Sequence, residues 1–146
     1  MKHDPLNRKI LKCLQTNARQ SNAEIGRQVG LTSPAVNERI KKMEDAGIIK
    51  GYFANINPFE CGYQLNAIIT LRAFMGKLKP FLSHVKTYDE VLNCYRITGN
   101  ENIVMEVVLK NQKHLESFID QLIVYGETKT QIVLSQVVEN NEVKPV

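Results

Sequence analysis

The sequence predicts an α+β protein with an N-terminal three-helix helix-turn-helix domain and a C-terminal ferredoxin-like βαββαβ domain. Apolar residues recur at helical spacing through the first third of the 146-residue chain, and capping residues separate the helical stretches. Farther along, stretches rich in branched residues alternate with two more helical stretches. The expected domains are residues 1–50 and 64–146, joined by a connector at residues 51–63 that contains a short strand.

Capping residues mark the ends of the expected N-terminal helices. Asp4 can cap the first helix, whose first position is then a proline. Ser21 and Glu24 have the spacing of a capping box at the start of the second helix, and Gly30 can end that helix in a left-handed conformation. Thr32 can cap the third helix. These signals predict three short helices in the first third of the chain.

The third helix is expected to bury one face and to end at Gly47. Val36, Ile40 and Met43 stand at positions i, i+4 and i+7, which is the spacing of a buried stripe. A tight turn at residues 29–32 joins this helix to the second one, so the three helices predict a helix-turn-helix unit. Such a unit is sometimes only a packing motif, and a binding function needs a second observation.

The distribution of positive charge is this second observation, because basic residues are concentrated in the first third of the chain, where the three helices are expected. Residues 1–50 hold ten Lys or Arg and five Asp or Glu, whereas the remainder holds nine basic and ten acidic residues. A domain that meets a polyanion is expected to carry such an excess, although an ordinary solvated helix face can carry it too. Together with the helix-turn-helix pattern, the charge favours binding of double-stranded DNA.

The third helix is the one expected to enter the major groove, with its N-terminal half at the base edges. Asn37 can pair with adenine, Glu38 can accept a hydrogen bond from cytosine, and the ring of Pro34 can contact a thymine methyl group. The predicted base contacts are Ser33, Pro34, Asn37 and Glu38.

Basic residues of the second and third helices are expected to contact phosphates, which adds affinity without sequence information. Arg39 has two possible roles, because it can reach a phosphate or pair with an acid inside the domain. The predicted phosphate contacts are Arg27, Arg39, Lys41 and Lys42.

The second half of the chain has the β-α-β-β-α-β order of a ferredoxin-like sheet. Two helices on one sheet face leave the other face open, and a second subunit is its natural cover. Strands are expected at residues 51–56, 65–74, 91–98, 103–109 and 128–138, and helices at residues 79–87 and 115–124.

The sequence gives no sign of catalytic, metal or membrane chemistry. The three cysteines form no C-x-x-C pair, and no Ser/His/Asp set or glycine-rich phosphate loop is apparent. No apolar run approaches the roughly 18 residues that a membrane span requires, and the N-terminus lacks a signal-peptide pattern. We therefore expect a cytoplasmic protein that is not an enzyme and has no metal, no cofactor and no membrane partner.

Short motifs in order along nearly the whole chain resemble the family of leucine-responsive and asparagine regulators, Lrp/AsnC. The N-terminal motifs are Asn17-Ala18-Arg19, Val29-Gly30-Leu31-Thr32 and Val36-x-x-Arg39-Ile40-x-x-Met43-Glu44-x-x-Gly47-Ile48-Ile49-x-Gly51-Tyr52. The C-terminal motifs are Cys94-Tyr95-x-Ile97-Thr98-Gly99 and Thr128-x-Thr130-x-Ile132-Val133-Leu134. The resemblance implies a transcription regulator that forms dimers through its C-terminal domain, commonly octamers of four dimers, and binds an amino acid or related small molecule between dimers.

The resemblance also implies where the effector binds. The loop between the two middle strands and the last strand supply parts of the pocket, and the family usually has an aspartate at the position of Asn102. Asparagine pairs less strongly with an ammonium group, so Glu101 would have to supply the charge, while Arg96 could pair with a carboxylate or be an ordinary exposed strand residue. The implied effector-binding residues are Arg96, Thr98, Gly99, Asn100, Glu101, Asn102, Gln131, Ile132 and Val133.

Three alternatives stay open at this point. The departure at Asn102 is compatible with a different ligand or with none, and in the second case the protein could be an architectural factor that wraps DNA. The helical domain could instead be a protein-interaction module beside a ligand-sensing domain. An enzyme on the ferredoxin-like sheet is the third alternative, for which the sequence offers no catalytic set.

Overall fold

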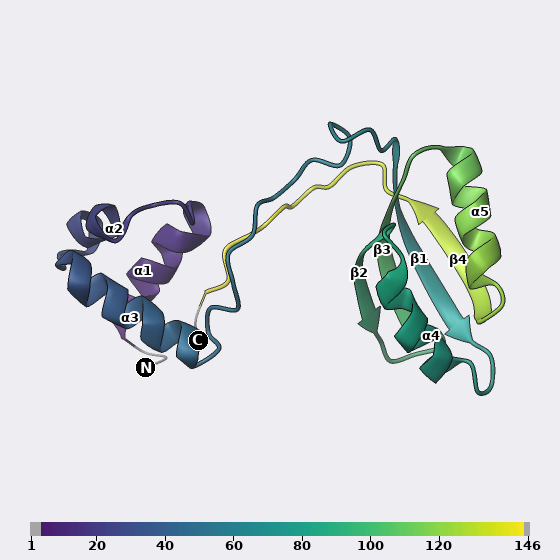
Figure 1. Cartoon of the computed structure of the whole chain (residues 1–146), viewed down its shortest axis with the longest axis horizontal. Coiled ribbons are helices and arrows are strands. Elements are labelled where there is room, and N and C mark those ends of the chain that lie inside the picture. Colours follow the sequence, from purple (N-terminus) through teal and green to yellow (C-terminus); the bar gives the residue numbers. More distant parts are fainter. Residues whose placement is uncertain (1–3, 145–146) are drawn as a thin grey trace. The chain divides into compact units, whose positions relative to one another are not determined.

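The computed structural model describes residues 4–144 and divides the chain into two compact units (Figure 1). The first unit runs to Asn55 and takes up the chain again from Val138, and the second comprises Ile56–Val137. The segment from Val138 is thus grouped with the helical unit, and the predicted extent of the second domain, residues 64–146, stays a prediction. Within the described residues, no helix is long and apolar enough to cross a membrane.

Two side-chain contacts hold the C-terminal segment in the helical unit. The backbone N–H of Val143 donates to Oε1 of Gln15 at 2.8 Å, and Nε2 of Gln15 donates to the Val143 carbonyl at 3.2 Å. Asn55 donates through Nδ2 to Oε1 of Glu139 at 2.7 Å. The amide of Gln15 thus pairs with both backbone groups of Val143, as a neighbouring strand would.

The helical unit has the three helices that the sequence predicts, and each begins after its predicted cap. Asp4 accepts from the N–H of Leu6 at 2.8 Å, Ser21 and Glu24 form the complete capping box, and Thr32 accepts from the N–H of Ala35. The helices are α1 (Pro5–Thr16), α2 (Asn22–Val29) and α3 (Ser33–Asp45).

The apolar stripes of the three helices meet in one small core. Val36, Ile40 and Met43 are buried as the spacing predicted. Gly26 lets α2 and α3 approach closely, because a Cβ there would overlap the Leu31 carbonyl oxygen of the following turn. The buried members of this core are Ile10, Ile25, Val29, Val36, Ile40 and Met43.

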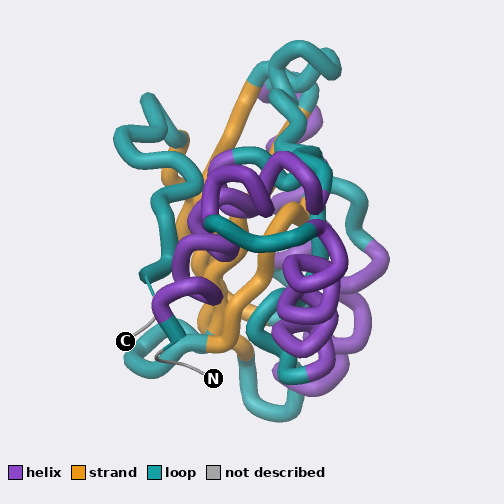
Figure 2. The backbone as a smooth tube through the Cα atoms, turned by 90° about the vertical axis from the view of Figure 1, so that its left-hand side faces the viewer, coloured by secondary structure: helices purple, strands orange, loops and turns teal. Residues whose placement is uncertain are grey.

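The second unit is a four-stranded antiparallel sheet in the order β2-β3-β1-β4, and its strands can be followed in orange in Figure 2. The predicted βαββαβ order is confirmed. The strands are β1 (Leu65–Ala73), β2 (Val91–Arg96), β3 (Ile103–Leu109) and β4 (Gly126–Ile132), and the helical segments are α4 (Leu78–His84), the 3-10 turn η1 (Val85–Thr87) and α5 (Gln112–Leu122).

Both helices of this unit pack on the same face of the sheet. Phe81 of α4 and Phe118 and Leu122 of α5 lie in one buried cluster with alternate residues of β1 and β3, among them Ile69 and Met105. The aromatic rings of this cluster meet edge to face, as between Tyr88 and Phe118 with ring centroids 5.2 Å apart. The helix-covered face is therefore the core of the unit.

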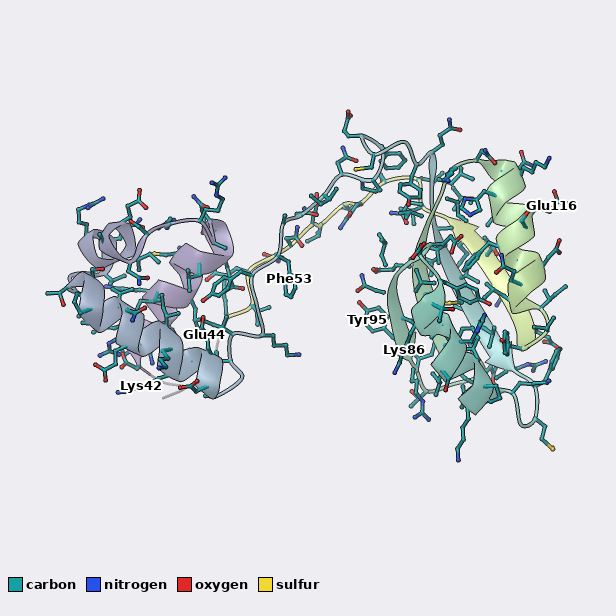
Figure 3. All side chains as sticks on the ribbon, viewed as in Figure 1. Lys42, Glu44, Phe53, Lys86, Tyr95 and Glu116 are labelled. Carbon is teal, nitrogen blue, oxygen red and sulfur yellow. The ribbon has the colours of Figure 1, made fainter. Side chains whose placement is uncertain are left out.

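Neither helix of this unit packs on the other face of the sheet. The strand register places Ile68 and Thr70 of β1, Val104 of β3 and Tyr95 of β2 on that face (Tyr95 is labelled in Figure 3). Tyr95 is half exposed. The Thr70 hydroxyl is a buried polar atom without a hydrogen-bond partner among the described residues.

Two predicted strands differ from the structure. Residues 51–56 are extended but form no strand, and the last strand ends at Ile132 instead of residue 138. The reason lies in the partner strand, because Val133 makes the last backbone bond, to the Asn66 carbonyl at 2.9 Å, where β1 begins. A strand needs a neighbouring strand for its backbone hydrogen bonds. The run of branched residues therefore predicted a last strand that was longer than the one β1 can pair with.

Smaller boundary differences have local causes. The helix predicted from residue 115 begins at Gln112, because Asn111 caps it by accepting from the N–H of His114 at 2.9 Å. The strand predicted to residue 98 ends at Arg96, where the N–H of Ile97 turns to the Asn102 carbonyl at 2.9 Å.

The close approach at Gly26 predicts that Gly26→Ala destabilises the helical unit by about 2 kcal/mol, as overpacking of a tight contact does. Amide hydrogen exchange within α1–α3 would measure the change. Gly30→Asn is the matched control: Gly30 has φ 75° with open space around it, and Asn tolerates the left-handed region. Equal protection in wild type and Gly26→Ala would show that the turn relaxes without cost.

Candidate functional site

The exposed face of α3 carries the four predicted base contacts. Ser33, Pro34, Asn37 and Glu38 are all exposed, and their spacing places them on one side of the helix. The opposite side holds the buried stripe described above. The N-terminal half of α3 therefore offers a polar surface on a helix that its apolar face fixes in place.

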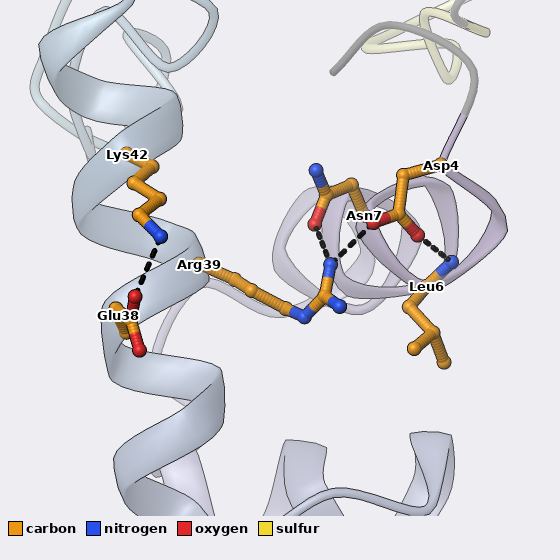
Figure 4. Close-up of polar contacts among 6 residues, drawn as sticks. All are labelled: Asp4, Leu6, Asn7, Glu38, Arg39 and Lys42. Carbon is orange, nitrogen blue, oxygen red and sulfur yellow. Dashed lines mark hydrogen bonds and ion pairs between the residues drawn. The ribbon is translucent and has the colours of Figure 1, made fainter.

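Two of these four side chains are held by neighbours. Nζ of Lys42 binds Oε1 of Glu38 at 2.5 Å, one helical turn away, and this contact lowers the pKa of the Glu38 carboxyl (Figure 4). Nδ2 of Asn22 donates to Oδ1 of Asn37 at 3.2 Å. Asn22 is the first residue of α2, so this bond connects the two helices of the helix-turn-helix.

Arg39 is turned into the domain. Its Nη1 donates to Oδ2 of Asp4 at 2.5 Å and to Oδ1 of Asn7 at 2.9 Å (Figure 4). Of the two roles predicted for Arg39, the structure shows the internal ion pair, and the phosphate contact stays a prediction. The guanidinium joins α3 to the start of α1.

Asp4 serves two purposes in this network. One carboxylate oxygen caps α1 and the other binds Arg39, and the bond from Arg39 followed by the bond from Leu6 lowers the pKa of Asp4. Asn7 is the buried polar residue of the described chain, and its amide oxygen is satisfied by the same guanidinium.

The other basic residues predicted to contact DNA differ in whether they form ion pairs within the described chain. Arg27 and Lys41 are exposed and form no ion pair within residues 4–144, whereas Lys42 is paired with Glu38.

Figure 3 shows Lys42 and Glu44 on α3, and Oε1 of Glu44 accepts a hydrogen bond from the Tyr52 hydroxyl at 2.8 Å. Burial and Glu44 together raise the pKa of Tyr52 to about 12.

The loop between β2 and β3 is anchored by Asn102. Its N–H donates to the Leu71 carbonyl at 3.0 Å, and its Oδ1 accepts from the N–H of Ala73 at 2.7 Å. The side-chain oxygen therefore fixes the loop to the end of β1, a task that an aspartate could also perform. Thr98, Gly99 and Asn100 are the exposed part of the loop.

Glu101 is paired within the chain. Its Oε1 lies 3.3 Å from Nζ of Lys129 on β4, and its pKa is lowered by a bond to its own backbone and then by this lysine. Lys129 is a residue that the sequence reasoning missed, because only the register of β4 against β1 brings it to the loop. Arg96, at the end of β2, is exposed.

The two predicted parts of the effector pocket are not together in one chain. Asn102 bonds to Leu71 and Ala73 at one end of β1, whereas Ile132 pairs with Ala67 and Val133 bonds to Asn66 near the other end. Four or more residues of strand separate these positions, or roughly 15 Å. The described residues contain no group of His, Cys, Asp or Glu that could hold a metal ion.

Comparison with known protein families gives one match for each unit. A model of winged helix-turn-helix DNA-binding domains matches residues 3–50, and a model of the Lrp/AsnC ligand-binding domain matches residues 66–143. The chain belongs to the Lrp/AsnC family. Within residues 4–50 the structure contains three helices and no strand.

Relatives across the family are similar over most of their length. The chain is 33% identical to the HTH-type transcriptional regulator FL11 of Pyrococcus abyssi, covering 95% of this chain and 94% of that protein. It is 36% identical to the HTH-type regulator Ptr1 of Methanocaldococcus jannaschii, with 82% and 81% covered. This Lrp/AsnC protein is accordingly an effector-responsive DNA-binding transcription regulator, as its two matched domains indicate.

Solved structures of the family agree with the fold. LrpC of Bacillus subtilis superposes with a TM-score of 0.90 at 28% identity, covering 94% of this chain and 99% of LrpC. Escherichia coli AsnC gives 0.86 at 29% identity, covering 97% and 98%. A Neisseria meningitidis transcriptional regulator in complex with L-Met gives 0.88 at 25% identity, covering 93% and 92%.

The Asp4–Arg39 pair predicts a pH-dependent contribution to the stability of the helical unit. Folding lowers the pKa of Asp4. The ion pair therefore contributes fully to the free energy of unfolding at pH values above the ordinary pKa of Asp, about 4, and this contribution is lost as the pH falls through the lowered pKa. Asp4→Asn keeps a good helix cap but loses the charge, so we expect it to be less stable than wild type at pH 7, with a gap that narrows as the pH is lowered towards 2.

Urea unfolding at both pH values would measure this difference. Asp45→Asn is the matched control, since Asp45 is an exposed acid of α3 without an ion pair among the described residues. A gap between Asp4→Asn and wild type that stays constant from pH 7 to pH 2 would exclude the charge as its source.

Proposed function

We propose that this Lrp/AsnC regulator binds duplex DNA by placing the N-terminal half of α3 in the major groove. The observation that carries the proposal is the exposed row of Ser33, Pro34, Asn37 and Glu38 on a helix whose other face is buried. Ser33 and Pro34 start the helix, which is where a recognition helix contacts base edges. Arg27 and Lys41 are available for phosphates, and the proposed location of the protein is the cytoplasm.

The DNA-binding form is proposed to be a dimer built on the open face of the sheet. Ile68, Val104 and Tyr95 supply apolar area there, and the Thr70 hydroxyl has no hydrogen-bond partner within residues 4–144. A second copy would cover this face and place two copies of α3 on one DNA site. An octamer of four such dimers is the further assembly proposed from the family.

The proposed DNA footprint predicts that Lys41→Ala combined with Lys42→Ala weakens binding to all sequences alike. Each phosphate contact that is lost lowers the slope of log affinity against log salt by about one. Lys41 is expected to contribute more than Lys42, because Glu38 already neutralises part of the Lys42 charge. Binding of duplex DNA at several salt concentrations would measure both effects.

Lys110→Ala with Lys113→Ala is the charge-matched control in the second unit. An unchanged slope in the Lys41 and Lys42 double variant would remove both lysines from the footprint. No salt-dependent binding of wild type to any duplex would instead favour a protein-interaction module.

The effector is proposed to be an amino acid or a related small molecule. Arg96 would pair with its carboxylate, while Glu101, already paired with Lys129, and the neutral Asn102 would provide a weaker site for its ammonium group. Because the loop and the end of β4 are apart in one chain, the pocket would be completed between subunits. The L-Met complex of the Neisseria relative supports this class of ligand.

Calorimetric titration with each amino acid is expected to give saturable heat with at least one, and Arg96→Ala should weaken that binding about tenfold or more. Arg19→Ala removes an equal charge from the helical unit and should leave it unchanged. If no amino acid gives heat or a thermal shift, the effector-independent architectural alternative is favoured, and a footprint with periodic protection would identify DNA wrapping.

A further inference from the structure

The amide of Asn37 is held by a residue that does not belong to the proposed recognition surface. We propose that Asn22 is a positioning residue that determines which half of the Asn37 amide faces DNA, and thereby which base it selects. This inference rests on the proposed function, since it requires α3 in the major groove. Its basis is the bond from Nδ2 of Asn22 to Oδ1 of Asn37, at 3.2 Å.

Both ends of this bond come from firmly placed backbone. Asn22 follows the capping box, in which Glu24 accepts from the N–H and hydroxyl of Ser21 at 2.6 and 2.8 Å. Asn22 is itself half buried, whereas Asn37 is exposed. The turn between the helices is fixed by bonds from the N–H groups of Gly30 and Leu31 to the Gly26 carbonyl, at 2.9 and 3.0 Å.

The bond leaves the two halves of the Asn37 amide in different situations. Oδ1 is occupied by Asn22, whereas Nδ2, with two hydrogens to donate, has no hydrogen-bond partner among the described residues. Asn37 therefore presents a donor to the DNA. Oδ1 keeps one lone pair, so its use as an acceptor is weakened and not abolished.

A donor in the major groove selects bases that offer acceptors. Guanine presents two, N7 and O6, whereas adenine presents N7 beside the N6 amino donor. The two-bond pairing with adenine that the sequence predicts for Asn37 needs Oδ1 as well as Nδ2. We therefore expect Asn37, while Asn22 holds it, to prefer guanine at its position in each half-site.

Substitution of Asn22 can reverse this preference without touching the recognition helix. A carboxylate only accepts hydrogen bonds, so in Asn22→Asp the Asn37 amide must turn to donate through Nδ2. It then presents Oδ1 to the DNA, which favours adenine or cytosine, the bases with an amino donor. In Asn22→Ala neither half is held, and the discrimination should largely disappear.

The experiment is selection of bound duplexes from a randomised DNA library by the full-length wild type and by each variant, followed by measurement of base frequencies. We expect a shift of about fivefold or more from guanine towards adenine or cytosine at one position per half-site in Asn22→Asp. Ala23→Asp is the matched control: it adds a carboxylate at the next, exposed residue of α2, so it should weaken binding without changing base preference.

Asn37→Ala identifies the position, because it should remove the preference there and make a second change at Asn22 ineffective. Amide exchange within α2 and α3 tests whether the variants keep the fold. A wild type that selects no sequence would contradict the proposed sequence-specific function itself. A wild type that selects a sequence, with the same base preferences in Asn22→Asp and Asn22→Ala, would overturn the role of Asn22, as would a uniform loss of preference at every position.

Discussion

The absence of a side chain at Gly26 is the constraint on which the DNA-binding unit depends. The chain leaves α2 by folding back against this residue, and the Gly26 carbonyl accepts two of the turn's N–H groups. With any Cβ in that position, the Leu31 carbonyl would have to move, and α3 would move with it. The angle between the helices then decides which face of α3 is buried. It also places Asn22 within hydrogen-bond distance of Asn37.

A second contact, between Arg39 and the start of α1, also holds α3 in place. Arg39 reaches back to Asp4 and Asn7, so α3 is held by α2 at one point and by the start of α1 at another. A charge for which the sequence left two roles open thereby joins α3 to α1. The placement of α3, and with it the proposed base contacts, thus depends partly on Asp4, Asn7 and Asn22.

Nearby residues in the sequence were sufficient to predict where the helices begin. The ends of the strands depend on partner strands that are distant in the sequence. Asp4, Ser21 and Thr32 act on residues two or three positions away, so their roles can be predicted from spacing. Ile132 ends β4 only because β1, some 65 positions earlier, begins where it does. The partners of Arg39 and Glu101 are likewise distant in sequence. Nothing in the spacing of residues brings Lys129 to the loop at Glu101, so this ion pair could not be predicted from the sequence.

The C-terminal segment returns to the helical unit, and this affects which fragments of the protein contain a complete domain. Its first unit is assembled from two separated stretches of sequence, with the sheet inserted between Asn55 and Val138. A fragment that stops at residue 50 or 55 is consequently an incomplete domain: it lacks the strap that lies along Gln15, and it bares the groove of about 1090 Å³ beside α1 that Val143 and Lys144 help to line. By the same reasoning, removal of the segment from Val138 onward would change the DNA-binding unit and not only the end of the sheet unit.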